Sequence, residues 1–104
     1  MNEPIHLHVS INSKEEAERL SNFLLEEKLV VCVQISKIHS KYWWKGNVEV
    51  TEEYLVIAKT FSDKFQIIVE EIKKRHTYEI PEIIALPIKY SSEEYLEWMR
   101  ETIY

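Results

Sequence analysis

The densest group of side chains able to do chemistry lies in one short run, His76-Thr-Tyr-Glu-Ile-Pro-Glu82. Imidazole binds copper and zinc, and carboxylates can complete such a site, so His76, Glu79 and Glu82 are candidate metal ligands. Their spacing lacks the specificity of a zinc-finger pattern, and a structural interpretation stays open. In that interpretation His76 bonds the last carbonyls of a preceding helix and Tyr78 docks its ring in an interface. Glu79 and Glu82 then pair with lysines.

A second pair of imidazoles, His6 and His8, lies two residues apart. Within a strand this spacing places both side chains on one face. If the strand is central in its sheet, that face is the open one. The two rings could share a metal ion there, or they could be hydrogen-bonded interface residues, and the sequence leaves both hypotheses standing.

Cys32 and Lys59 are candidate functional residues because each is a reactive side chain within an otherwise apolar run. A free cysteine in such a run most often behaves as a small hydrophobic residue, and metal or redox use of Cys32 is the alternative. A nucleophile would also need an adjacent base. For Lys59 we expect an ion pair with a glutamate of residues 79–82. Its functional alternative is to bind an anion in a cleft between subunits.

Three adjacent aromatic residues, Tyr42, Trp43 and Trp44, favour an interface. Two adjacent indoles on a strand face opposite ways, so one can pack inward and the other on a neighbouring subunit. Tryptophan and tyrosine dominate interface energies. A base-stacking platform is disfavoured because 18 acidic against 13 basic residues give a net charge of −5, which argues against nucleic acid as a partner.

The sequence contains no recognisable catalytic group. There is one glycine, Gly46, so no glycine-rich phosphate loop is possible, and the one aspartate, Asp63, stands at an expected helix start. We therefore expect a protein without enzymatic activity.

Alternating and helical patterns predict the elements that must position these residues. Residues 4–11 alternate as a strand. Ser13 and Glu16 form a capping box for a helix that ends near Lys28. Two strands follow, joined by a turn at Lys45-Gly46-Asn47. A second helix begins at Ser62-Asp63, a short edge strand runs from Ile83 to Ile88, and Ser91 or Ser92 caps a last helix. The inward-facing helical residues are expected to be Ala17, Leu20, Phe23 and Leu24, then Phe65, Ile68, Val69 and Ile72, then Tyr95, Leu96, Met99 and Ile103.

The resulting order, β-α-β-β-α-β-α, predicts an α+β fold for residues 1–104 as one domain. Its first six elements form the split βαβ of a ferredoxin-like fold, with an antiparallel sheet and both crossover helices on one face. The hairpin is long: the 16 residues 30–45 would span roughly 50 Å if extended. A domain of this size has a diameter of roughly 34 Å, so the hairpin either bends or lays its tip on another subunit.

Two runs, Tyr42-Trp-Trp-Lys-Gly46 and His76 to Ile83, closely resemble the CutA family of divalent-cation tolerance proteins. The resemblance implies a ferredoxin-like subunit in a homotrimer similar to the PII signalling proteins, and a role in tolerance of copper and other divalent metals without an established enzymatic activity. Three positions depart from the common pattern: Asn12, Gln34 and Thr77. The alternative function is a signalling or scaffold trimer whose clefts between subunits bind a small metabolite or a partner protein.

Location is predicted from three features. No apolar run approaches the ~18 residues that a membrane-spanning helix needs, so we expect no membrane association. A single cysteine fits a reducing compartment, and the N-terminus does not resemble a signal peptide, so we expect a cytoplasmic protein.

Overall fold

Strand β1 (Pro4–Ile11) is the centre of the molecule. In the computed structural model, which describes residues 2–104, it pairs with β3 (Asn47–Phe61) on one side and with β4 (Ile83–Pro87) on the other, both antiparallel. Strand β2 (Cys32–Trp44) extends the sheet beyond β3, which gives the strand order β2-β3-β1-β4. The predicted ferredoxin-like α+β fold is confirmed, and β4 is an edge strand as Pro87 indicated.

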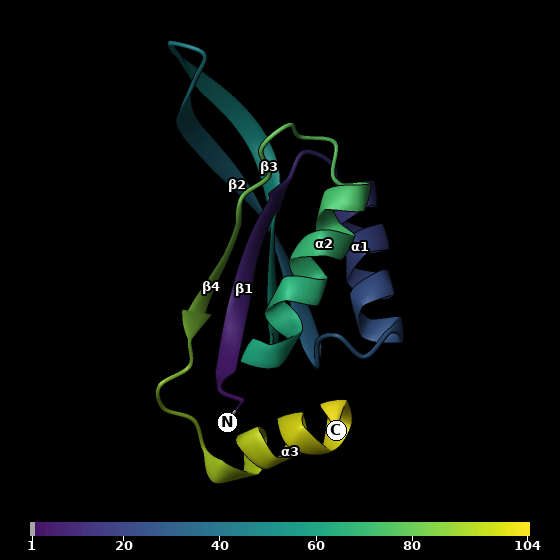
Figure 1. Ribbon diagram of the computed structural model, residues 1–104. Helices are drawn as coiled ribbons and strands as arrows, with labels where there is room; N and C mark the ends of the chain where they lie inside the picture. Colours follow the sequence, from purple (N-terminus) through teal and green to yellow (C-terminus); the bar gives the residue numbers. More distant parts are fainter. Residues whose placement is uncertain (1) are drawn as a thin grey trace.

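Helices α1 (Lys14–Glu26) and α2 (Phe65–Arg75) lie side by side on one face of the sheet, and α3 (Glu93–Ile103) crosses the end of the sheet near the N-terminus (Figure 1). A short 3₁₀ turn, η1 (Ser62–Lys64), precedes α2, so the helix proper begins slightly later than its predicted start. The covered face holds a core whose buried members are Leu7, Val9, Ile11, Ala17, Leu20, Leu24, Val30, Val56, Ala58, Ile68 and Ile72.

Helix α1 begins as predicted, because the Ser13 side chain accepts a hydrogen bond from the Glu16 amide at 3.1 Å. It ends at Glu26, short of Lys28. Lys28 adopts a φ of 53°, a left-handed conformation in which a helix stops. Phe23 is half-buried at the edge of the core.

Helix α3 packs on the end of the sheet through one residue above all. Met99 is fully buried against Val31 and Phe61, with Leu96 and Ile103 partly buried beside it. Tyr95 was predicted to face the core, but it is 37% exposed, and its hydroxyl lies 3.7 Å from Cys32 Sγ. Ser92, whose side chain accepts from the Tyr95 amide at 3.3 Å, is the cap.

The hairpin of β2 and β3 projects beyond the rest of the sheet (Figure 1). β1 pairs with β3 only from Tyr54 onward, so residues 47–53 pair with β2 alone and form a two-stranded ribbon. The chain reverses at Lys45 and Gly46, both with positive φ, and Asn47 already begins β3. The molecule measures 44 × 26 × 22 Å. Among residues 2–104, no helix covers the other face of the sheet (Figure 1).

Candidate functional site

Residues 76–82 follow α2 and carry no helix or strand, as the sequence predicted. His76 ends the helix, its amide donating to the Ile72 carbonyl at 2.8 Å. The ring then joins two other parts of the chain. Nε2–H donates to the Ser10 carbonyl at 2.8 Å, and Nδ1 accepts from the Tyr78 amide at 3.1 Å. A carbonyl only accepts and an amide only donates, so this arrangement requires a neutral ring protonated on Nε2.

Tyr78 anchors the segment to the sheet. Its hydroxyl donates to Glu53 Oε2 at 2.6 Å, and Glu53, on β3, is only 3% exposed. Burial, and then the hydrogen bond to this carboxylate, raise the pKa of Tyr78 well above its usual value. The phenol therefore stays protonated and satisfies a buried acceptor. The rings of Tyr78 and His76 also contact each other, with centroids 4.7 Å apart.

The other two predicted metal ligands lie at the surface. Glu79 and Glu82 are exposed, and Glu82 Oε1 accepts from the Ser10 hydroxyl at 3.5 Å. Among residues 2–104, no three histidine, cysteine or acidic side chains come close enough together to hold a metal ion. The structure thus brings His76 and Glu82 to the same residue, Ser10, and the metal site at His76, Glu79 and Glu82 stays a prediction.

A groove of about 900 Å³ separates the hairpin from residues 78–82. One wall comes from residues 39–44 of β2, the other from residues 78–82, and Ser10 and Glu53 lie between them. Trp43 is 75% exposed while Trp44 is half-buried, so the two indoles face opposite ways as predicted. Residues Tyr42 to Trp44 lie on one side of the groove, and Glu79 and Glu82 lie on the other.

Cys32 and Lys59 form a separate cluster at the other end of the sheet. Lys59 Nζ lies 3.7 Å from Cys32 Sγ and donates to Gln34 Oε1 at 2.8 Å. The predicted ion pair between Lys59 and a glutamate of residues 79–82 is wrong, because Lys59 pairs in register with Cys32 at the far end of β2. The Tyr95 hydroxyl lies 3.7 Å from the same sulfur, and burial followed by this contact raises the pKa of Tyr95 to about 12.

The candidate residues therefore divide between the two ends of one uncovered sheet face, with His6 and His8 on that face between them. The family model described as CutA1 divalent ion tolerance protein matches residues 5–102. This chain belongs to the CutA1 family.

CutA1-family relatives match almost the whole chain. The divalent-cation tolerance protein CutA of Archaeoglobus fulgidus is 42% identical over 97 residues, which are 93% of this chain and 95% of the relative. A solved structure from that organism, described as a periplasmic divalent cation tolerance protein CutA, has a TM-score of 0.94 at 40% identity and covers 97% of this chain and 99% of its own. The crystal structure of CutA1 from Oryza sativa has a TM-score of 0.93 at 39% identity, over 98% of this chain and 94% of its own. The resemblance drawn from the two sequence runs is confirmed.

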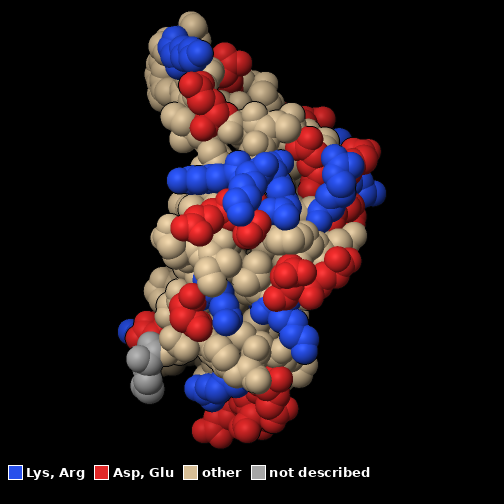
Figure 2. All heavy atoms as spheres, turned by 45° about the vertical axis from the view of Figure 1, so that its right-hand side comes forward, with Lys and Arg blue, Asp and Glu red and all other residues tan. Residues whose placement is uncertain are grey.

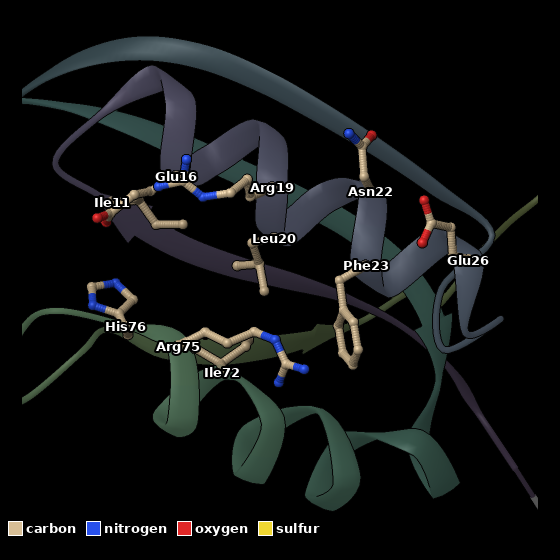
Figure 3. A pocket seen from close by; sticks show the side chains of 10 residues that line it. All are labelled: Ile11, Glu16, Arg19, Leu20, Asn22, Phe23, Glu26, Ile72, Arg75 and His76. Atoms are coloured by element: carbon tan, nitrogen blue, oxygen red, sulfur yellow. The ribbon is translucent and has the colours of Figure 1, made fainter.

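A feature of this CutA1-family chain that the sequence did not indicate is a hollow of about 510 Å³ between α1 and α2 (Figure 3). The Arg75 guanidinium lies 3.6 Å above the Phe23 ring and is held at 2.6 Å by Glu71. The sequence shows Phe23 and the basic last turn of α2, but it does not show that the two meet, because their contact depends on how the helices pack. In Figure 2 a band of basic side chains crosses this region, and acidic side chains gather at the bottom over α3.

Within residues 2–104, none of the helices is both long and apolar enough to cross a bilayer.

Proposed function

We propose that this protein contributes to the tolerance of divalent cations, copper among them, by binding or responding to the ions without an enzymatic step. The observation that carries the proposal is the match along nearly the entire chain to the Archaeoglobus fulgidus protein, whose sequence and solved structure are both named for divalent-cation tolerance. Because the match includes both ends of the sheet and the hairpin, it extends to every candidate site described above.

The proposed assembly is a homotrimer in which each hairpin lies on a neighbouring subunit. Support comes from apolar side chains that the single chain leaves exposed in two places. Trp43, Val48 and Val50 are exposed on the projecting ribbon, and Ile84 and Leu86 are exposed on β4. Contiguous apolar surface of this kind is typical of protein interfaces. Pairing between subunits would also protect the edges of the ribbon.

Residues 76–82 are the proposed ion-responsive region, with His76, Glu79 and Glu82 as its ligands. Glu79 and Glu82 line the groove beside the hairpin, and His76 lines the hollow between α1 and α2. For His76 to bind a metal through Nδ1, the ring must give up the hydrogen bond from the Tyr78 amide. Ion binding there would therefore be coupled to movement of residues 76–82. Replacing His76 with alanine should remove that coupling.

The proposed location is the cytoplasm, supported by the single cysteine, which is a free thiol. Because one solved relative is described as periplasmic, cell fractionation is the direct measurement. Recovery of the protein with periplasmic markers would contradict the proposal.

A growth experiment tests the function. Cells lacking the protein are grown over a series of copper and zinc concentrations, with and without the gene for this chain restored. We expect the concentration that halves growth to fall in the deletion strain and to recover on complementation. Equal growth of both strains with every divalent ion tested would overturn the proposal. An unchanged response to hydrogen peroxide serves as the control for general stress.

A further inference from the structure

The hollow between α1 and α2 has the size and lining of a site for a small organic molecule (Figure 3). Its volume of about 510 Å³ falls within the roughly 300–1,000 Å³ that is usual for such sites. Its inner lining is apolar, since Ile11, Leu20 and Ile72 are buried core residues and Phe23 is half-buried beside them. An uncharged organic group that replaces water against these side chains therefore gains hydrophobic burial.

The hollow remains open to solvent in the proposed trimer. That assembly buries the ribbon and the uncovered face of the sheet, whereas α1 and α2 cover the opposite face (Figure 1). Within residues 2–104, no residue lines both the hollow and the groove beside the hairpin. A ligand can thus occupy the hollow of an assembled protein without displacing a neighbouring subunit.

Arg75 is held in one orientation at this hollow. Its guanidinium lies 3.6 Å from the centroid of the Phe23 ring, and the two side chains point toward each other between the helices (Figure 3). Arg75 Nη1 donates to the Glu71 carbonyl at 3.1 Å and to Glu71 Oε2 at 2.6 Å. Because the orientation is already fixed, a ligand would lose little affinity to the ordering of this side chain.

The fixed guanidinium keeps donors for a ligand. A guanidinium has five N–H donors, and the contacts with Glu71 use the two on Nη1. No other hydrogen bond within residues 2–104 engages Arg75, so the Nε and Nη2 edge remains for an acceptor from outside the chain. Two parallel donors on one edge match the two oxygens of a carboxylate.

The other charged residues around the hollow favour a ligand with a single negative charge. Arg19 also lines it and has no ion-pair partner within residues 2–104. Glu16 and Glu26 line it as well. Because their carboxylates repel a dianion more than a monoanion, phosphate and its esters are disfavoured.

We propose that the hollow binds a small monocarboxylate with an apolar body. Its carboxylate pairs with the Nε and Nη2 edge of Arg75, and its apolar part lies against Phe23 and Leu20. The site is separate from the divalent-cation role proposed above, and binding needs no metal ion.

The test is a titration of the full-length protein with phenylacetate, followed by calorimetry and by the chemical shifts of the backbone amides. Phenylacetate joins one carboxylate to one aromatic ring. We expect saturable binding, with shifts at residues 19–26 and 72–76. Phenylacetamide lacks the charge and acetate lacks the ring, so each should bind roughly tenfold more weakly. Inorganic phosphate should also bind more weakly than phenylacetate.

Variants of α2 test the role of Arg75. Arg75→Gln should weaken phenylacetate binding roughly tenfold, and Arg75→Lys should weaken it too, because lysine lacks the planar fork. Lys73→Gln is the matched control: it removes a cation from the same last turn, but Lys73 does not line the hollow. At physiological salt its effect should be less than about twofold. Circular dichroism checks folding.

Several results would overturn the site. One is unchanged affinity in Arg75→Gln, and another is equal weakening by Arg75→Gln and Lys73→Gln, which would indicate general attraction of anions. Binding of phenylacetamide or phosphate as tight as that of phenylacetate would contradict the ligand class. If a variant does not fold, the wild-type shifts decide: shifts confined to residues 39–44 and 78–82 would place the ligand in the groove instead.

Discussion

Tyr78 shows, at the scale of single residues, how one hydroxyl holds a functional segment in place. The phenol donates a hydrogen bond to Glu53, a carboxylate that is almost completely buried. Leaving a buried acceptor without its donor is more costly than the bond itself is favourable. The position of residues 76–82 thus depends strongly on this contact.

Replacing Tyr78 with phenylalanine should lower the free energy of unfolding by about 1–3 kcal/mol, because Glu53 loses its donor while remaining buried. Urea denaturation measures the change. The control is Tyr90→Phe, which removes the same hydroxyl from an exposed ring and should change stability by less than about 0.5 kcal/mol. Equal losses in the two variants would contradict the anchoring role.

Alkaline pH should destabilise the protein through its tyrosines. Burial and hydrogen bonding raise the pKa of Tyr78, and they raise the pKa values of Tyr95 and Tyr104 to about 12 from a usual value of 10.0. The unfolded chain therefore loses these protons first. Their contribution to stability is complete below about pH 10 and declines as the pH rises toward 12.

Urea titrations at about pH 9 and about pH 11 measure this decline, which should be smaller in Tyr78→Phe than in the wild-type protein. The ultraviolet absorbance of phenolate provides a second readout, because these three rings should ionise in the native protein only above their usual range. An equal free energy of unfolding at the two pH values would contradict the raised pKa values of these tyrosines.

At the scale of elements, the structure shows which of two adjacent serines caps α3, a choice that the sequence left open. Ser92 accepts from the Tyr95 amide, whereas the Ser91 hydroxyl donates to the Ser92 carbonyl. Ser92→Ala should lower stability by about 1 kcal/mol, the usual loss for an N-cap. Ser91→Ala is the matched control and should have a smaller effect. Hydrogen exchange of the α3 amides should be faster in Ser92→Ala than in the wild-type protein. Faster exchange in Ser91→Ala, with Ser92→Ala unchanged, would identify Ser91 as the cap.

The hairpin turn is the second element whose chemistry can be tested directly. Gly46 has a φ of 83°, and a Cβ added there would meet no atom within 4 Å. The loss on Gly46→Ala is therefore purely conformational, about 1 kcal/mol. Lys45→Asn at the preceding position should be neutral or stabilising, because asparagine tolerates positive φ. Thermal unfolding compares the two, and a neutral Gly46→Ala would mean that the turn adopts another conformation.

At the scale of the whole molecule, the uncovered sheet face and the projecting ribbon are the features that the proposed trimer explains. Light scattering after size exclusion should give a mass near three times 12.5 kDa. Val50→Lys, on the ribbon where the side chain is 59% exposed, should shift the mass toward that of one chain. The reason is that the lysine ammonium would lose its hydration if the ribbon were buried against a neighbouring subunit.

Leu25→Lys is the control for the assembly. Leu25 is also exposed, at 40%, but it lies on α1, on the helical side of the molecule. The trimer should tolerate it. A wild-type mass equal to one chain, or equal disruption by the two variants, would contradict the proposed use of the ribbon.

Much of the architecture could be read from local patterns. The alternation of Ile5, Leu7 and Val9 with the histidines predicts β1 and its two faces, and the capping box at Ser13 predicts the start of α1. Both are short-range effects, set by side-chain direction along a strand and by unpaired amides at a helix end. Helix ends were less predictable, because left-handed geometry at Lys28 has no strong signal in its residue type.

The sequence by itself therefore determined the element order, the faces of β1 and the family. Only the tertiary structure decided which candidate residues meet. It separated Lys59 from the acidic segment, paired Tyr78 with Glu53, and set the distance between His6 and His8. The physical reason is that periodicity depends on neighbours within a few residues. These contacts instead depend on strand register and helix packing, which are set by burial across the whole chain.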